Sequence, residues 1–181
     1  MRQHVLFIQG GGPGAYEVDG MLAASLRYAL GPTYDVRYPK MPHEEDPEME
    51  AWKAQIAAEL ATPGDDVILV GHSVGGAALL KYLSEVPVEK SIAGLFLIAA
   101  PSWDNENWNY DDLKLPRGIP KKLSKIPRIF FYHSRDDKIV PFAHLALHAA
   151  RLPRATIREF DGRGHQLAND LSEVAADIRG G

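Results

Sequence analysis

The sequence DVILVGHSVGGAALLKYL, residues 66–83, joins four consecutive apolar residues to Gly-His-Ser-Val-Gly-Gly and then to a run of helix-forming residues. A short apolar run followed by glycine and a helical pattern predicts a buried strand that turns directly into a helix. Ser73 stands at this junction, with Gly71 and Gly75 two positions away on either side. Ordinary packing gives little reason for a serine at such a turn, so the segment indicates a functional site.

Residues 71–75 match the pattern G-x-S-x-G, in which a serine occupies a tight turn between a strand and a helix. Bulky side chains two positions from the serine would collide, and the following helix places unpaired N–H groups near the hydroxyl. A pattern this short also occurs by chance in glycine-rich turns. The strand predicted directly before it and the helix predicted directly after it therefore favour the functional interpretation.

The same alternation of strand and helix extends along the rest of the chain. The expected strands are 5–12, 34–42, 66–72, 93–100, 128–134 and 155–160, and the expected helices are 15–30, 46–60, 74–86, 141–152 and 169–179. Near-continuous apolar strands that alternate with helices indicate the α/β class. We therefore expect a three-layer αβα sandwich around a six-stranded, mostly parallel sheet.

Length and composition exclude several classes of function. The chain has 181 residues, 45% hydrophobic and 24% charged, which suits one globular domain spanning 1–181. A net charge of −4 and a pI near 6.0 give no electrostatic reason to expect nucleic acid or an anionic membrane as a partner. The absence of cysteine excludes disulfides, thiolate catalysis and cysteine-bound zinc. The first apolar run is too short for a signal peptide or a membrane span, so a cytoplasmic protein is expected.

A serine hydroxyl becomes a strong nucleophile when a base removes its proton, and the base needs an acid to orient it. In enzymes with this G-x-S-x-G turn, the acid and then the histidine follow the serine along the chain, each after a later strand. Asp136 and Asp137 follow the fifth expected strand, and His165 follows the sixth in a glycine-rich loop. Each residue alone could belong to an ordinary surface loop, but their order and placement favour catalysis.

With these residues the chain resembles the α/β-hydrolase superfamily, and its size resembles the small lidless serine hydrolases related to retinoblastoma-binding protein 9. The resemblance covers nearly the whole chain and implies the strand order 2-1-3-4-5-6 without a substantial lid. It also implies that the acid stands in an Asp-x-x-Val-Pro pattern, which residues 137–141 supply. Asp137 is therefore the expected acid, whereas Asp136 is expected to be a solvated loop residue or a turn former.

Backbone N–H donors are needed where negative charge develops on the attacked carbonyl oxygen. One is expected from Val74, the residue after the serine, and the other from the loop QGGGPG after the first strand. The superfamily usually has His-Gly at the start of that loop, whereas this chain has Gln9 and Gly10. The resemblance makes Gly11 the expected second donor and Gly12 the alternative.

The same glycine-rich loop is open to a nucleotide-binding interpretation. The fingerprint G-x-G-x-x-G fits from Gly10 when alanine is accepted at its last position, Ala15. From Gly12 it fails, because Glu17 stands where glycine is needed and its charge would repel pyrophosphate. No G-x-x-x-x-G-K-[ST] pattern is present, so this interpretation is the weaker one.

Several histidines other than His165 need an interpretation. His144 and His148 stand four residues apart on an expected helix, a spacing that can bind zinc, but no third ligand or H-E-x-x-H pattern accompanies them. They are expected to be structural, and no metal or organic cofactor is expected. His72 is common beside the serine in the superfamily and is expected to support the turn, while His133 is assigned no role.

The expected activity is hydrolysis of a small-molecule ester or related acyl substrate by Ser73, His165 and Asp137 through an acyl-enzyme. Thioesterase, amidase and perhydrolase activities are alternatives within the same chemistry. A non-catalytic binding protein is an alternative of another class, because a fold alone does not establish activity. The presence of serine, acid and histidine at workable positions favours the enzyme.

The long stretch 101–127 is expected to be irregular and to stand where the superfamily usually inserts a lid. It is too short for a substantial cap and contains Trp103, Trp108 and Tyr110. These aromatic residues either line a substrate pocket or pack the stretch against the edge of the sheet.

Overall fold

The predicted strands form one sheet in the computed structural model, which describes residues 2–62, 66–103 and 114–180. The spatial order is β2-β1-β3-β4-β5-β6, and each neighbouring pair is parallel. The strands are β1 (Gln3–Ile8), β2 (Tyr34–Arg37), β3 (Val67–His72), β4 (Ile92–Ile98), β5 (Ile129–Ser134) and β6 (Thr156–Phe160). The parallel pairing expected from the alternation of strands and helices is confirmed, and so is the strand order that the resemblance implies.

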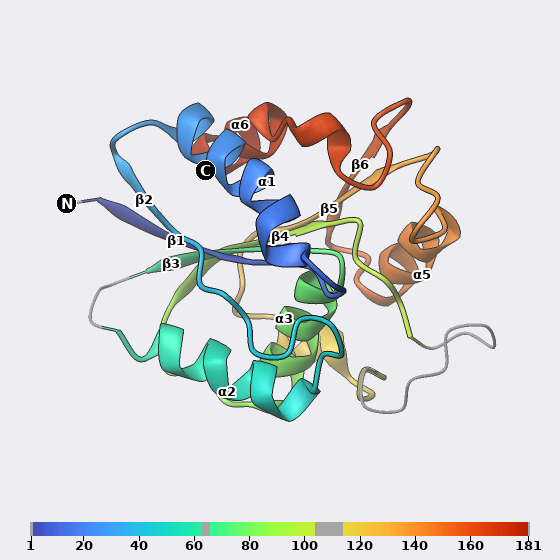
Figure 1. The fold of residues 1–181 in the computed structure, drawn as a ribbon. Coiled ribbons are helices and arrows are strands. Elements are labelled where there is room, and N and C mark those ends of the chain that lie inside the picture. The colour runs from blue at the N-terminus through green and yellow to red at the C-terminus, as the bar shows by residue number, and fades with distance from the viewer. Residues whose placement is uncertain (1, 63–65, 104–113, 181) are drawn as a thin grey trace.

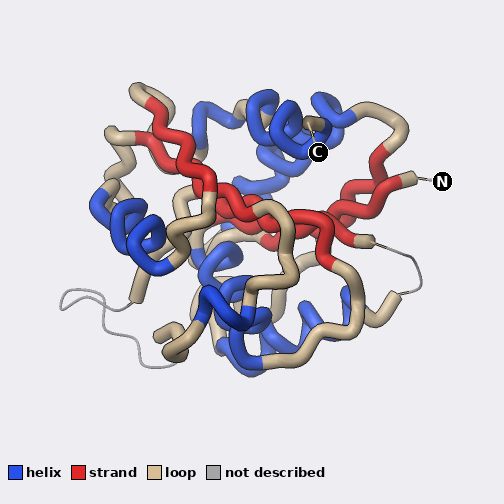
Figure 2. The backbone as a smooth tube through the Cα atoms, turned by 180° about the vertical axis from the view of Figure 1, so that it is seen from behind, coloured by secondary structure: helices blue, strands red, loops and turns tan. Residues whose placement is uncertain are grey.

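Helices cover both faces of this sheet and complete three layers. They are α1 (Ala15–Leu30), α2 (Met49–Leu60), α3 (Val74–Glu85), α4 (Ile119–Lys122), α5 (Ala143–Arg151) and α6 (Ser172–Arg179), with a 3-10 turn η2 (Leu167–Asn169) before α6. Helices α1 and α6 lie above the sheet in Figure 1, and α2 and α3 lie below it. Figure 2 shows the same separation of layers from behind. No helix among the described residues has the length and apolar composition that crossing a bilayer requires.

Two hydrophobic cores, one on each face, explain why the strands are almost continuously apolar. Leu69 of β3 packs in the core that includes α2 and α3, while its neighbours Ile68 and Val70 pack in the core that includes α1 and α6. Successive side chains of a strand point to opposite faces, and here both faces are covered. All six residues of β3 are therefore buried.

Several element boundaries differ from the sequence prediction. Strand β1 covers residues 3–8 and not 5–12, and β2 ends at Arg37 and not at residue 42. Helices α5 and α6 begin two and three residues later than predicted. Helix α2 begins at Met49 and not at residue 46, because Glu48 is extended (φ −85°, ψ 114°) and Asp46 precedes a proline, where helical conformation is disfavoured. Pro47 therefore precedes the helix and does not occupy its first turn. The stretch 101–127, expected to be irregular, contains the short helix α4.

Candidate active site

The turn between β3 and α3 holds Ser73 in a strained conformation. Its φ of 51° and ψ of −124° are unusual for a residue with a side chain, and such a conformation costs about 1–3 kcal/mol. The Ser73 N–H donates to the carbonyl oxygen of Ile98 on β4 (2.8 Å), and the Ser73 carbonyl accepts the N–H of Gly76 (3.0 Å). These bonds fix the serine, which is 7% exposed, at the N-terminus of α3.

The glycines around Ser73 allow backbone segments to approach one another closely. A Cβ atom on Gly75 would lie 2.2 Å from the carbonyl oxygen of Gln9, at the end of β1. A Cβ atom on Gly71 would lie 2.7 Å from the Cα atom of Gly76. The predicted collision of side chains at these positions is confirmed, because α3 starts directly against the ends of β1 and β3.

Asp137 and His165 meet where β5 and β6 end. The Oδ2 atom of Asp137 lies 2.8 Å from Nδ1 of His165, and its Oδ1 atom accepts the N–H groups of Ile139 (2.8 Å) and Val140 (3.0 Å). The Asp137 side chain is fully buried, whereas 14% of the His165 side chain is exposed. The contact fixes the ring with Nδ1 toward the carboxylate and leaves Nε2 for another partner.

The neighbouring carboxylate, Asp136, binds the loop before His165 and not the imidazole ring. It is exposed, as expected of a solvated loop residue, and its Oδ1 accepts the Ser134 hydroxyl (2.5 Å) and the Gly164 N–H (3.1 Å). Because Gly164 directly precedes His165 in the chain, this hydrogen bond stabilises the loop that carries the imidazole.

A second histidine contacts Asp137, and the sequence patterns did not indicate it. His133 on β5 is 1% exposed, with Nε2 at 3.1 Å from Asp137 Oδ2 and 2.9 Å from the carbonyl oxygen of Val140. Its place four residues before the acid is the signal that could have revealed it. Burial alone would raise the pKa of Asp137, but hydrogen bonds from His133 and His165 outweigh burial and hold that pKa well below its ordinary value. Burial lowers the pKa of His165, and the bond to Asp137 opposes this shift.

The His165 loop also lies against the residue that precedes Ser73. The ring centroids of His72 and His165 are 4.7 Å apart, and Nε2 of His72 lies 3.1 Å from the carbonyl oxygen of His165. Among the hydrogen bonds of the described residues, none joins the Ser73 hydroxyl to His165. Contacts of this kind are often long in unliganded active sites and tighten when substrate binds.

Gly11 and Val74, the two expected oxyanion donors, lie side by side. A Cβ atom on Gly11 would lie 3.3 Å from Cγ2 of Val74. The N–H of Gly12 already donates to the carbonyl oxygen of Glu44 (2.5 Å). Within the described part of the chain, the N–H of Gly11 has no comparable hydrogen bond, which favours Gly11 over Gly12 as the donor.

Gln9, which replaces the usual histidine, is fully buried and holds the loop that follows β1. Its Nε2 donates to Glu44 Oε2 (2.7 Å), and its Oε1 accepts the N–H of Met41 (2.9 Å). The same Glu44 oxygen accepts the N–H of Tyr16 in the first turn of α1 (2.7 Å). A dinucleotide fingerprint would need this helix start for phosphate. A protein carboxylate lies there instead, which argues against the nucleotide interpretation.

Of the three aromatic residues expected near a pocket, the structure describes Trp103. Trp103 is 6% exposed and packs in the core below the sheet, which agrees with the packing alternative. Trp108 and Tyr110 lie outside the described residues. A pocket lined by these aromatics therefore stays a prediction.

The two histidines of α5 are buried and hydrogen-bonded to the backbone of the chain that follows β4. His144 and His148 are 3% and 1% exposed. His144 Nδ1 accepts the N–H of Ser102 (2.8 Å), and His148 Nε2 donates to the carbonyl oxygen of Ala100 (3.0 Å). These bonds fasten the chain after β4 to α5. No group of three or more potential metal-binding side chains occurs among the described residues.

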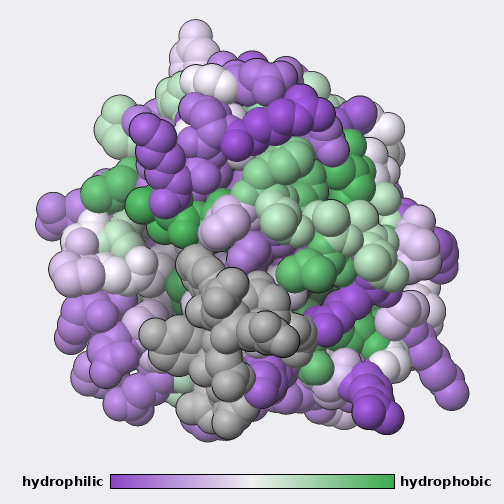
Figure 3. Space-filling model, turned by 90° about the vertical axis from the view of Figure 1, so that its right-hand side faces the viewer, coloured by the Kyte–Doolittle hydropathy of each residue, from purple (hydrophilic) through white to green (hydrophobic). Residues whose placement is uncertain are grey.

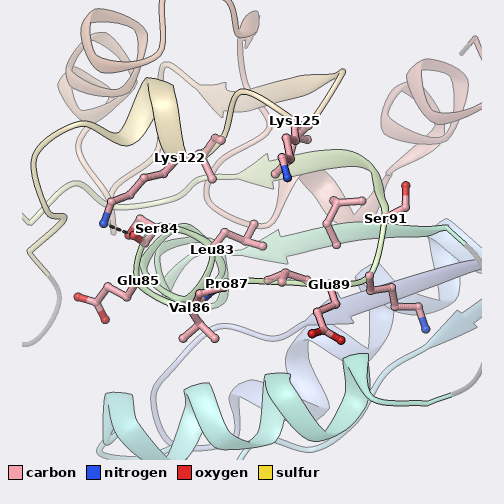
Figure 4. A pocket seen from close by; sticks show the side chains of 14 residues that line it. Leu83, Ser84, Glu85, Val86, Pro87, Glu89, Ser91, Lys122 and Lys125 are labelled. Atoms are coloured by element: carbon pink, nitrogen blue, oxygen red, sulfur yellow. Dashed lines mark hydrogen bonds between the residues drawn. The ribbon is translucent and has the colours of Figure 1, made fainter.

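A hollow of about 530 Å³ lies at the other end of the sheet (Figure 4). The end of α3 and the beginning of β4 form its walls, with Lys122 and Lys125 at its edge. No candidate catalytic residue lines it. Figure 3 faces the opposite end of the molecule, where α3 begins, and shows apolar surface in green to the right of the centre of this view.

A sequence model of the family described as serine hydrolase matches residues 27–170, about four-fifths of the chain. The chain belongs to the serine hydrolase family. The YdeN protein of Bacillus subtilis (strain 168) is 25% identical to this serine hydrolase over 133 residues, which cover 72% of the chain and 69% of YdeN.

Solved structures show the same fold for this serine hydrolase. The crystal structure of the B. subtilis ydeN gene product matches with a TM-score of 0.76 at 20% identity, over 98% of this chain and 97% of that one. CarC, a serine hydrolase involved in carbazole degradation, gives 0.74 at 14% identity over 98% and 90%. SOBER1 of Arabidopsis thaliana gives 0.67 at 16% identity over 99% and 98%. The fold is therefore that of the α/β-hydrolases. Membership of the serine hydrolase family makes the protein a hydrolase.

Proposed function

We propose that this serine hydrolase cleaves small esters or related acyl substrates through a covalent acyl-enzyme on Ser73. The observation that carries the proposal is the 2.8 Å contact between Asp137 and His165, in a loop that packs against the residue before the strained serine. A base oriented by a carboxylate beside a serine at a helix N-terminus is the arrangement that nucleophilic acyl transfer requires.

In the proposed reaction, the Ser73 hydroxyl attacks the substrate carbonyl carbon while Nε2 of His165 accepts its proton. Asp137 keeps the second proton of the ring on Nδ1 and stabilises the imidazolium that forms. The N–H groups of Gly11 and Val74 donate to the oxyanion of the tetrahedral intermediate. The imidazolium then protonates the leaving group. A water molecule activated by the same histidine attacks the acyl-enzyme and releases the carboxylic acid.

The charge states of the two titrating residues support these roles. The lowered pKa of Asp137 keeps its carboxylate ionised at neutral pH. The lowered pKa of His165 keeps its ring neutral there, so Nε2 is available to accept a proton. The base and its partner are therefore in the protonation states that the first step needs.

The length of chain between β4 and β5 supports a small substrate. Thirty residues, 99–128, join the two strands, and α4 is the one helix among those that are described. A connection this short leaves little room for a cap over the site. Without a cap to cover a long hydrocarbon chain, short acyl chains on soluble alcohols are the substrates that we expect.

The proposal is tested with p-nitrophenyl esters of increasing acyl length and with matched thioesters and amides. We expect hydrolysis of short esters, and Ser73→Ala should lower kcat by at least about 10³-fold with little change in fold. Ser124→Ala, at an exposed serine near α4, is the matched control and should retain activity. Full turnover by the Ser73 variant would contradict the proposal. Faster cleavage of thioesters or amides than of esters would contradict the ester as the preferred substrate class.

A further inference from the structure

We propose that Asp19 is a positioning residue. Its one buried carboxylate fixes the relative positions of the nucleophile, the base and the oxyanion loop. The inference rests on the proposed function and adds a residue that no sequence motif marks. Asp19 lies in the second turn of α1, and 1% of it is exposed. A carboxylate so deeply buried in a helix that covers a sheet needs a specific reason, because burial of an unpaired charge is costly.

The carboxylate of Asp19 joins three segments that are far apart in the sequence. Its Oδ2 accepts the N–H of Gly10 (2.7 Å) and lies 2.7 Å from Nδ1 of His72. Its Oδ1 accepts the side-chain amide of Gln166 (3.1 Å). These partners come from the loop after β1, the end of β3 and the loop after β6.

Each of these partners is the direct chain neighbour of a residue in the proposed reaction. Gly11 follows the first partner, Ser73 follows the second, and His165 precedes the third. Asp19 therefore touches none of the reacting groups, but it binds a chain neighbour of the nucleophile, of the base and of one oxyanion donor. A shift of its helix would move the nucleophile, the base and the oxyanion donor relative to one another.

His72 extends this connection to the base itself. Its two ring nitrogens face two acceptors, the carboxylate of Asp19 and the carbonyl oxygen of His165. The distances are 2.7 Å to Asp19 Oδ2 and 3.1 Å to the carbonyl oxygen, so the ring links the buried carboxylate to the backbone of the base. Burial would raise the pKa of Asp19, but the charge and hydrogen bond of His72 hold it below the ordinary value, so the carboxylate is ionised.

The segment after His165 is strained and needs such an anchor. Residues 167–169 have φ values of 43°, 55° and 56°, three consecutive left-handed conformations without glycine. Such conformations persist when surrounding contacts over-determine them. Helix α1 holds both ends of this turn, because Asp19 binds Gln166 and the hydroxyl of Ser25 accepts the N–H of Leu171 (2.9 Å).

The test uses Asp19→Asn, which keeps the shape and removes the charge. We expect kcat to fall about 10- to 100-fold with KM within about threefold, because misplaced catalytic groups lower the rate more than the binding. Asp177→Asn is the matched control, since that carboxylate on α6 accepts the Tyr132 hydroxyl and the Arg158 guanidinium, away from the site. It should lower thermal stability and leave kcat unchanged.

Amide hydrogen exchange provides a readout that needs no turnover. Asp19→Asn should speed exchange at 10–12, 71–74 and 163–170, whereas Asp177→Asn should speed it around α6. Loosening of α1 alone, or a kcat within twofold of wild type, would overturn the inference. Failure of the proposed function would instead appear as wild-type turnover that does not depend on Ser73, and the exchange pattern would still decide the role of Asp19.

A second variant covers the case in which Asp19→Asn does not fold. His72→Asn places an amide donor near the position of Nδ1, so it keeps the bond to Asp19 and loses the contact with the His165 carbonyl. We expect faster exchange in the loop after β6 and a lower kcat. His72→Gln, whose amide reaches toward that carbonyl, should restore slow exchange in this loop. Unchanged exchange and kcat in His72→Asn would overturn the connection from Asp19 through His72 to the base.

Discussion

Asp136 and Asp137 carry the same carboxylate at adjacent positions, and their surroundings separate their roles. Asp137 is buried and lies 2.8 Å from the His165 ring, whereas Asp136 is exposed and binds the backbone N–H of Gly164. The Asp-x-x-Val-Pro pattern, taken from the resemblance to the α/β-hydrolases, favoured Asp137 over Asp136 as the acid. No motif marks His133, and its position four residues before Asp137 is the one sequence signal for the contact between the end of β5 and the loop that follows.

Asp137→Asn tests this assignment at the residue scale. The amide keeps the size of the side chain but cannot hold the His165 proton on Nδ1 as the carboxylate does, so we expect kcat to fall by about 10³- to 10⁴-fold. Asp136→Asn is the matched variant and should retain most of the activity. Steady-state kinetics on the same ester measure both. Equal losses in the two variants would contradict the assignment of Asp137 as the acid.

The pH dependence of the reaction follows from His165. Activity requires the neutral ring, and burial lowers its pKa below the ordinary 6.5. The acid limb of kcat/KM should therefore have its midpoint below pH 6.5, and activity should rise with pH through that midpoint. A pH–rate profile of the wild-type enzyme measures it. A midpoint above 6.5 would mean that the base is another group or that His165 is stabilised as its cation.

At the scale of elements, the six strands and all helices except the short α4 could be predicted from apolar periodicity, but the buried face of α1 could not. Val18 and Met21, which contribute to the helical pattern of that segment, are 52% and 60% exposed. Asp19 between them is buried. Its partners are 9, 53 and 147 residues away along the chain, so no local pattern signals them. The strand–turn–helix around Ser73 could be predicted because its constraints are local.

Gly75→Ala tests the close approach of α3 to β1. The added Cβ would lie 2.2 Å from the carbonyl oxygen of Gln9, so the helix start must move. We expect a loss of roughly 3 kcal/mol in the free energy of unfolding and a lower kcat, because Ser73 moves with the helix. Denaturant unfolding and ester hydrolysis provide the measurements.

Gly20→Ala is the matched helical control for this prediction. No atom lies within 4 Å of a Cβ built at Gly20 in α1. The substitution should stabilise the protein by up to about 1 kcal/mol, since alanine favours helix over glycine. A stabilising effect of Gly75→Ala similar to that of Gly20→Ala would refute the packing account of the turn.

At the scale of the whole molecule, the sheet order brings the candidate residues together. Strands β1, β3, β5 and β6 are parallel neighbours or near neighbours, so their carboxyl ends lie at one edge of the sheet (Figure 1). The alternating pattern of strands and helices indicated a parallel sheet, and the resemblance to the α/β-hydrolases supplied its order. Local sequence does not specify which long-range hydrogen bonds tie the loops at that edge together.

Stability should depend on pH through the buried histidines of α5. Burial lowers the pKa of His148 from 6.5 to about 4, so the unfolded chain binds a proton that the folded protein does not bind. The free energy of unfolding should therefore fall as the pH drops from about 6.5 to about 4, with about 3 kcal/mol from His148. Urea unfolding across this range measures the slope.

His148→Gln isolates that contribution. Its amide can still donate to the carbonyl oxygen of Ala100 but does not titrate, so the dependence of stability on pH should become weaker between about 4 and 6.5. His43→Gln, at an exposed histidine, serves as the control and should keep the wild-type slope. An unchanged slope in His148→Gln would contradict this account.

The central claim is that Ser73 is the nucleophile activated by His165 and Asp137. Reaction with a fluorophosphonate, followed by mass mapping of the modified peptide, tests it most directly, because this reagent bonds covalently to an activated serine. The account predicts one phosphonate on Ser73, with labelling slowed strongly in His165→Ala and absent in Ser73→Ala. A label on another residue, or no label on folded wild-type protein, would contradict it.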